Sequence, residues 1–101
     1  MNAVQTVEVV AKMLAGEHAS DDPNITKIFW AQHPTEVRLV EITSSVSDKG
    51  EVLPFRFTAH LPDVPYQSVL VLLSPGDWER HDKLDWPEDF GDLELVFQRA
   101  N

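Results

Sequence analysis

The chain has 101 residues, the length of a single domain, and its 43% hydrophobic and 25% charged residues are typical of a folded globular protein. It contains no cysteine, which excludes disulfide bonds, thiolate chemistry and cysteine-bound zinc. The net charge of −9 argues against nucleic acid as a direct partner, because phosphate binding requires basic patches.

The N-terminal segment has the spacing of an amphipathic helix. Apolar residues recur at three- and four-residue intervals between positions 3 and 15. Gly16 is placed to end this helix, because glycine readily adopts the left-handed conformation that follows many last helical turns. A strand over Val7–Val10 is the competing interpretation. The polar residues 17–24 are predicted to form a loop.

Two predicted strands follow, joined by a tight turn. Residues 25–31 and 36–43 both have strand-like alternation, and Pro34 lies in the turn, so the two segments are predicted to pair as an antiparallel hairpin. The next alternating segment spans residues 51–59. Pro54 lacks a backbone N–H, which places this strand at an edge of the sheet or makes its start irregular.

Ser68–Ser74 is the most apolar stretch of the chain, with five consecutive apolar residues. It is too short for a typical helix, and it is predicted to be the central strand of the sheet, buried on both faces. Ser74 is predicted to cap a single helical turn over residues 77–81, with Pro75 as the first helical residue.

The last alternating segment spans residues 92–98, and Leu93, Leu95 and Phe97 are expected to share one of its faces. No repeated β–α–β pattern is present, so the strands are expected to pair mainly in an antiparallel manner. The sequence therefore predicts a single α+β domain over residues 1–101. One N-terminal helix packs on a mostly antiparallel sheet of about five strands.

Motifs for catalysis and for metal or cofactor binding are weak. The four histidines are expected in separate loops and have no paired ligand spacing, and the four glycines are isolated, so they form no phosphate-binding loop. Neither serine beside the apolar stretch lies in a Gly-x-Ser-x-Gly motif. The sequence therefore predicts no catalytic residue, no metal and no cofactor.

Negative charge is concentrated in residues 77–94, where eight acidic and two basic residues give a net charge of −6. Two of the three tryptophans lie in the same segment. Rigid aromatic side chains anchor many interfaces and acidic groups steer basic partners, which predicts a partner-binding surface. Alternatively, the aromatic side chains fold inward and fix a long loop to the sheet, and the two interpretations are compatible. The residues of the predicted surface are Trp78, Asp85, Trp86, Asp89 and Phe90.

A second hypothesis places a small-molecule site or an active site beside the loops that flank the apolar stretch. It requires a concave pocket with convergent polar groups. Its candidate residues are His60, Asp63, Tyr66 and His81. A third, an acidic mimic of nucleic acid, requires carboxylates in a line on one face, and their clustering in one segment argues against it.

Several short motifs, taken together, are similar to those of a known group of proteins. They include Arg38-Leu39-Val40-Glu41, Pro54-Phe55-Arg56-Phe57 and Pro75-Gly76-Asp77-Trp78. Over residues 25–92 the chain resembles a group of small uncharacterised bacterial proteins that are common in cyanobacteria. The resemblance implies a bacterial origin. It also implies that the central strands and the turn that contains Trp78 belong to one structural unit. It implies no activity.

These observations predict a non-catalytic protein-interaction or regulatory module of the bacterial cytosol. The N-terminus lacks a basic region followed by an apolar run, and no apolar run approaches the ~20 residues of a membrane span. The protein is therefore expected in the cytoplasm, without membrane contact. The expected partner is another protein, or a second copy of the chain bound through an edge strand.

Overall fold

The computed structural model of the protein describes residues 3–60, 63–87 and 90–100. Their secondary-structure elements are, in chain order, α1 (Ala3–Asp21), β1 (Ile25–Ala31), β2 (Val37–Thr43), β3 (Phe55–His60), β4 (Pro65–Leu73), α2 (Pro75–Glu79), the 3₁₀ turn η1 (His81–Lys83) and β5 (Leu93–Gln98). The five strands form one sheet in the order β3-β4-β2-β1-β5. The predicted α+β fold, with one N-terminal helix and a mostly antiparallel sheet, is confirmed.

Strand pairing confirms the hairpin between β1 and β2, and β3 lies at an edge of the sheet, as Pro54 directly before it predicts. The pairs β1–β5 and β3–β4 are also antiparallel, whereas β2 and β4 are parallel. The parallel pair arises because the chain leaves β2, passes beyond the position of β4 to form β3 at the edge, and returns as β4. The acid-rich residues 77–94 then cross the sheet and lead into β5 at the opposite edge.

The central strand is β2, in which every residue is buried. The prediction that Ser68–Ser74 forms the centre, shielded on both faces, is therefore wrong. β4 is the second strand from the edge, and its Leu72 is 38% exposed. The physical reason is the placement of α1, which packs mainly on β1, β2 and β5 and leaves β4 exposed at Leu72.

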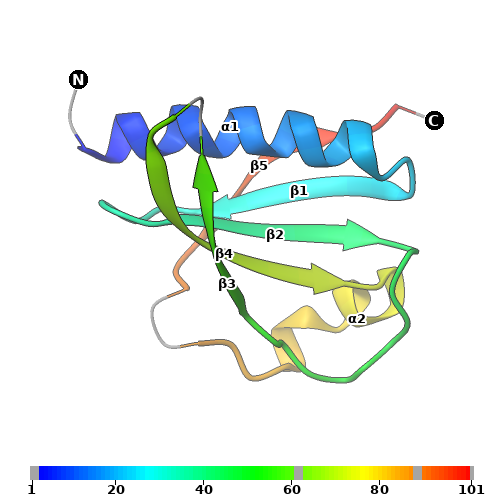
Figure 1. The fold of residues 1–101 in the computed structure, drawn as a ribbon. Coiled ribbons are helices and arrows are strands. Elements are labelled where there is room, and N and C mark those ends of the chain that lie inside the picture. Colours follow the sequence, from blue (N-terminus) through cyan, green and yellow to red (C-terminus); the bar gives the residue numbers. More distant parts are fainter. Residues whose placement is uncertain (1–2, 61–62, 88–89, 101) are drawn as a thin grey trace.

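Two apolar clusters lie on opposite faces of the sheet. The first joins α1 to the side of the sheet that carries Ile28, Trp30 and Leu39. The second, around Val40 and Val71, is covered by the segment between β4 and β5. Figure 1 shows α1 along one side of the sheet and α2 on the other. No helix in the described part of the chain is both long and apolar enough to span a bilayer.

Helix α1 continues through Gly16 to Asp21, so the predicted end at Gly16 and the competing strand are both wrong. The apolar stripe continues because Ala15 and Ala19 are buried against the sheet, while the space around Gly16 is open. The Arg99 guanidinium donates hydrogen bonds to the carbonyls of Ala19 (2.7 Å), Asp22 and Ile25, which satisfies carbonyl groups at the helix end.

Strand β5 contains an irregularity that the sequence pattern does not reveal. The register with β1 shifts between Ile28 and Phe29, so Phe97 lies opposite Ile28 and Leu95 lies opposite Phe29. A shift of one residue reverses the side on which later side chains lie. Phe97 therefore packs in the cluster beneath α1, whereas Leu93 packs in the other cluster. The expectation that Leu93, Leu95 and Phe97 share one face is wrong.

Candidate functional site

The segment that covers the face opposite α1 begins with a capped helical turn. The Ser74 hydroxyl accepts a hydrogen bond from the Asp77 backbone N–H at 3.0 Å, and Pro75 takes the first helical position. The predicted cap is confirmed, with the helix at Pro75–Glu79 rather than over 77–81. The same hydroxyl donates to Asp48 Oδ1 at 2.5 Å. A Cβ at Gly76 would lie 2.7 Å from that carboxylate, which explains a glycine there.

Asp77 joins the turn to the preceding loop. Its buried carboxylate accepts the backbone N–H groups of Lys49 (2.8 Å) and Gly50 (3.1 Å), and the guanidinium of Arg80 donates to it at 2.8 Å. The hydrogen bond from Lys49, followed by that from Arg80, lowers the pKa of Asp77 below its ordinary value. The carboxylate therefore stays ionised, and α2 is held in one position against the sheet.

Substitution of Ser74 by alanine is expected to reduce the free energy of unfolding by about 1 kcal/mol, because a helix loses its cap and Asp48 loses a donor. Urea unfolding monitored by circular dichroism measures the change. Ser47→Ala, which alters an exposed serine of the same preceding loop, is the matched control and is expected to change little. Equal effects of the two substitutions would contradict a capping role.

A continuous series of aromatic contacts lies on α2 and the loop that follows it. Phe29 of β1 stacks on Trp78 with ring centroids 4.7 Å apart, and Trp78 stacks on His81 at 3.9 Å. Trp86 meets His81 edge-on, and Phe90 lies 5.9 Å from Trp86. All of these side chains are half-buried. They fold against the sheet, as the structural interpretation predicts, and still present part of their surface to solvent.

The aromatic side chains line an open cavity of about 440 Å³, called here the aromatic pocket. Its volume falls within the range of small-ligand sites, and it has room for one long side chain of a partner or a small organic molecule. The pocket is lined by Phe29, Trp78, His81, Trp86, Phe90, Gly91, Asp92 and Leu93.

Hydrogen bonds within the lining define its chemistry. The Trp86 indole N–H donates to the His81 carbonyl at 2.8 Å, which fixes the ring. His81 Nδ1 lies 2.7 Å from the Trp78 carbonyl, an acceptor, so Nδ1 carries the proton and Nε2 of the neutral ring is itself an acceptor. Asp92 contributes an exposed carboxylate. In the described part of the lining, Asp92 and the neutral form of His81 therefore both present acceptors to a ligand.

The structure brings together three of the five residues predicted for the partner-binding surface. Trp78, Trp86 and Phe90 line the pocket. Asp85 is exposed beside Trp86 but is not part of the lining, and Asp89 lies outside the described residues. Sequence reasoning missed Phe29 and Asp92, which join the site only through strand order. The alternation in β1, which points Phe29 away from Trp30, was the available signal for Phe29.

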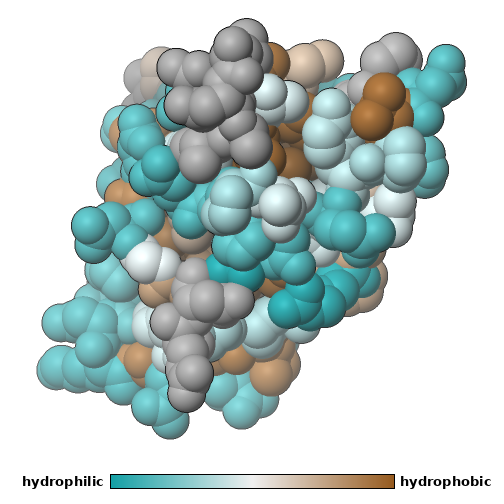
Figure 2. Space-filling view, turned by 90° about the vertical axis from the view of Figure 1, so that its left-hand side faces the viewer, coloured by the Kyte–Doolittle hydropathy of each residue, from teal (hydrophilic) through white to brown (hydrophobic). Residues whose placement is uncertain are grey.

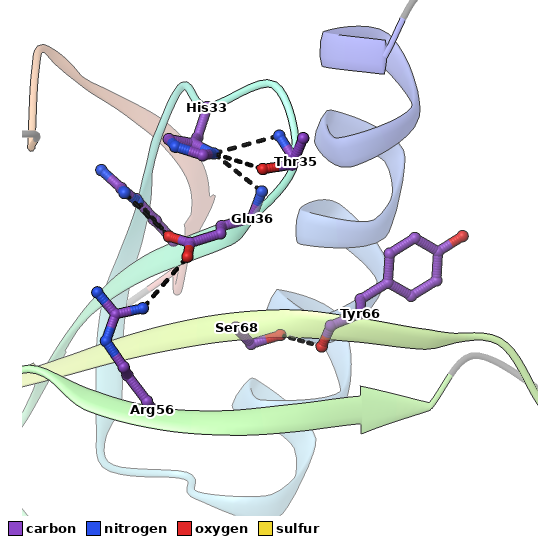
Figure 3. Close-up of polar contacts among 7 residues, drawn as sticks. His33, Thr35, Glu36, Arg56, Tyr66 and Ser68 are labelled. Atoms are coloured by element: carbon purple, nitrogen blue, oxygen red, sulfur yellow. Dashed lines mark hydrogen bonds and ion pairs between the residues drawn. The ribbon is translucent and has the colours of Figure 1, made fainter.

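The four residues of the small-molecule hypothesis are not brought together. Tyr66 packs in the cluster beneath α1, and Figure 3 shows its ring on the side of the helix. His81 packs against Trp78 on the opposite face, so the sheet separates it from Tyr66. His60 and Asp63 are exposed near the connection between β3 and β4. Within the described ranges, no three His, Asp or Glu side chains are grouped to hold a metal.

Comparison with known proteins finds no matching family model and no matching curated protein. A functional assignment therefore depends on the geometry and chemistry of the aromatic pocket.

Proposed function

We propose that the protein is a non-catalytic interaction module whose aromatic pocket receives a cationic side chain, arginine or lysine, from a basic partner protein. One observation carries the proposal. The walls of the pocket are aromatic, and the ionisable side chains in its described lining, Asp92 and His81 in its neutral form, present hydrogen-bond acceptors. Such a site favours a ligand that is positively charged and donates hydrogen bonds.

Aromatic walls suit a cation because the face of a tryptophan or phenylalanine ring attracts positive charge. Within the protein itself, the Arg38 guanidinium carbon lies 5.4 Å from the centre of the Phe90 ring, which shows that this ring accommodates a guanidinium group. A carboxylate or phosphate ligand would be disfavoured by Asp92 and by the net charge of −6 over residues 77–94. The same charge would accelerate the approach of a basic partner.

Binding is a better account of the pocket than catalysis because His81 is not arranged as a base. Its Nδ1–H is held by a backbone carbonyl, and in the described residues no hydroxyl or carboxylate side chain is hydrogen-bonded to its ring. An activated nucleophile requires such a partner. The cytoplasmic, bacterial setting expected from the sequence is part of the same proposal.

The proposal is tested with peptides that differ only in charge. A short peptide with one arginine is compared with the same peptide carrying citrulline, which keeps the shape of arginine and lacks its charge. Saturable shifts of the Trp86 indole N–H signal in NMR spectra are expected for the arginine peptide at concentrations up to ~10 mM, and are expected to be much weaker for citrulline. Absence of saturable binding by arginine and lysine peptides would contradict the proposal.

Variants distinguish the pocket from the general acidity of the protein. Asp92→Asn is expected to weaken arginine-peptide binding about tenfold, because it removes a charge-assisted hydrogen bond. Asp63→Asn removes the same charge from a distant exposed position and is the matched control, with little change expected. Trp86→Ala is expected to abolish measurable binding. Similar losses in Asp92→Asn and Asp63→Asn would show attraction by the net charge alone.

A further inference from the structure

The two edge strands of the sheet are protected to different degrees. β5 is interrupted by a register shift against β1, and Asp92 directly precedes it, while its own Glu94 accepts a hydrogen bond from the Trp30 indole N–H. β3 pairs with β4 in an unbroken register over six residues, and it contains no acidic residue, no lysine and no proline. Bulges, charges and prolines are the usual means by which a sheet edge avoids pairing with another chain. β5 is interrupted and has an acidic residue directly before it, whereas β3 is unbroken and has only Pro54 directly before it.

The single charged residue of β3 does not guard its outer side. The Arg56 guanidinium donates to Glu36 Oε1 at 3.2 Å. Glu36 immediately precedes β2, which lies beyond β4 as seen from β3, so the Arg56 side chain leans inward across the sheet. Figure 3 shows Arg56 directed toward Glu36. The backbone groups on the outer side of β3 therefore remain accessible.

Exposed apolar side chains gather beside the same edge. Phe55 is 62% exposed and Leu53 is 52% exposed, and both line a hollow of about 320 Å³ together with Leu70 and Leu72. Helix α1 does not reach this hollow, because it packs on β1, β2 and β5. Figure 2 shows the molecule from the left-hand side of Figure 1, and the face seen there is mostly hydrophilic with small hydrophobic patches.

The charge distribution indicates which partner can approach this edge. Residues 49–60 contain Lys49 and Arg56 against Glu51, a net charge of +1 in a chain whose total is −9. Two copies of an acidic protein repel one another over most of their surface, and this repulsion is weak at a segment without net negative charge. A basic partner would instead be drawn to residues 77–94. The occupant that fits the β3 edge is another copy of the chain.

We propose that the protein self-associates through β3, which pairs with β3 of a second copy about a twofold axis. Two identical strands related by such an axis run antiparallel, so the two sheets join into one sheet of ten strands. The side of the sheet beneath α1 continues across the axis, and Phe55 of each copy gains an apolar neighbour from its partner. The interface lies at the edge of the sheet and leaves the aromatic pocket open, so it is independent of the proposed binding function.

The test is the mass of the protein in solution, measured by size-exclusion chromatography with light scattering and by sedimentation velocity. The full chain is expected at twice its mass of 11.4 kDa at micromolar concentrations. Phe55→Asp is expected to give a monomer, because it places a charge of the same sign on both sides of the axis. Leu95→Asp alters a residue 45% exposed on the other edge strand and is the matched control, which is expected to remain dimeric.

Further measurements keep the outcome decisive. Circular dichroism tests whether Phe55→Asp is folded. If it is not, Thr58→Glu, at an exposed position of the same strand, takes its place and is expected to dissociate the dimer. Amide exchange in β3 is expected to slow as protein concentration rises. A monomeric wild-type protein at ~1 mM, or a dimer that Leu95→Asp dissociates and Phe55→Asp does not, overturns the proposal.

Discussion

Replacement of Trp30 by alanine is expected to reduce the free energy of unfolding by ~4 kcal/mol. The side chain is 1% exposed in the cluster between α1 and the sheet, and its indole N–H donates to Glu94 Oε2 at 3.1 Å. Removal of a large buried ring forfeits its apolar burial and leaves a cavity that the rigid sheet cannot close. Domains of this size are commonly stable by 5–15 kcal/mol, so a large fraction of the total would be lost.

Urea unfolding followed by far-ultraviolet circular dichroism measures this loss without relying on tryptophan fluorescence. Trp86→Ala is the comparison, since it removes the same side chain from the wall of the open pocket and is expected to cost less than half as much. Trp30→Phe, which keeps most of the volume, is expected to lie between them. If Trp86→Ala destabilised the protein as much as Trp30→Ala, Trp86 would be part of the core and not the wall of a binding site.

Local structure was predictable where it depends on neighbouring residues. The hairpin, the Ser74 cap and the edge position of the strand after Pro54 all follow from turn, cap and proline chemistry, which acts over a few residues. The end of α1 is not visible in the sequence pattern, because Gly16 favours a helix end and the burial of Ala15 and Ala19 depends on the fold. A helix tolerates one glycine when packing continues beyond it.

Strand order was not predictable, because the central strand carries charged residues. β2 contains Arg38 and Glu41, both buried, whereas residues 69–73 of β4 are wholly apolar. The apolar run was therefore the better candidate for the centre on composition alone. A charge can lie at the centre of a sheet only if it is paired. Arg38 is paired with Glu36, two residues away in the sequence, whereas His18, the partner of Glu41, is close to it only in the folded chain.

The candidate site was predictable in part for a similar reason. The density of aromatic residues between positions 78 and 90 identified three residues of the pocket lining from sequence. The other two residues depend on strand order. Phe29 lies on β1, and Asp92 reaches the site because the chain crosses the sheet to form β5 beside β1. Contacts between segments far apart in the sequence depend on topology, which the pattern of residues did not specify.

The buried carboxylate of Glu41 predicts that stability depends on pH. It lies on the side of the sheet beneath α1 and is hydrogen-bonded to Nδ1 of His18, which is half-buried near the end of the helix. This hydrogen bond raises the pKa of His18 above its ordinary value of 6.5; burial opposes the shift, and the charges of Glu41, Glu17 and Asp21 add to it. A raised pKa in the folded state means that protonated His18 stabilises the fold. This contribution is complete below about pH 6.5 and is lost as the pH rises through the folded-state pKa.

His18→Ala is expected to cost about 2 kcal/mol at pH 6, less than the loss of a fully buried partner because solvent reaches part of the His18 side chain. The deficit relative to wild type is expected to shrink as the pH rises, since the wild-type protein loses its charged pair while the variant has none. Urea unfolding at a series of pH values from 5.5 to about 9 measures both curves. His60→Ala, which removes an exposed histidine from β3, is the control and is expected to follow the wild-type pH dependence. A deficit in His18→Ala that is constant across this range would show that the imidazole contributes packing alone, without the ion pair to Glu41.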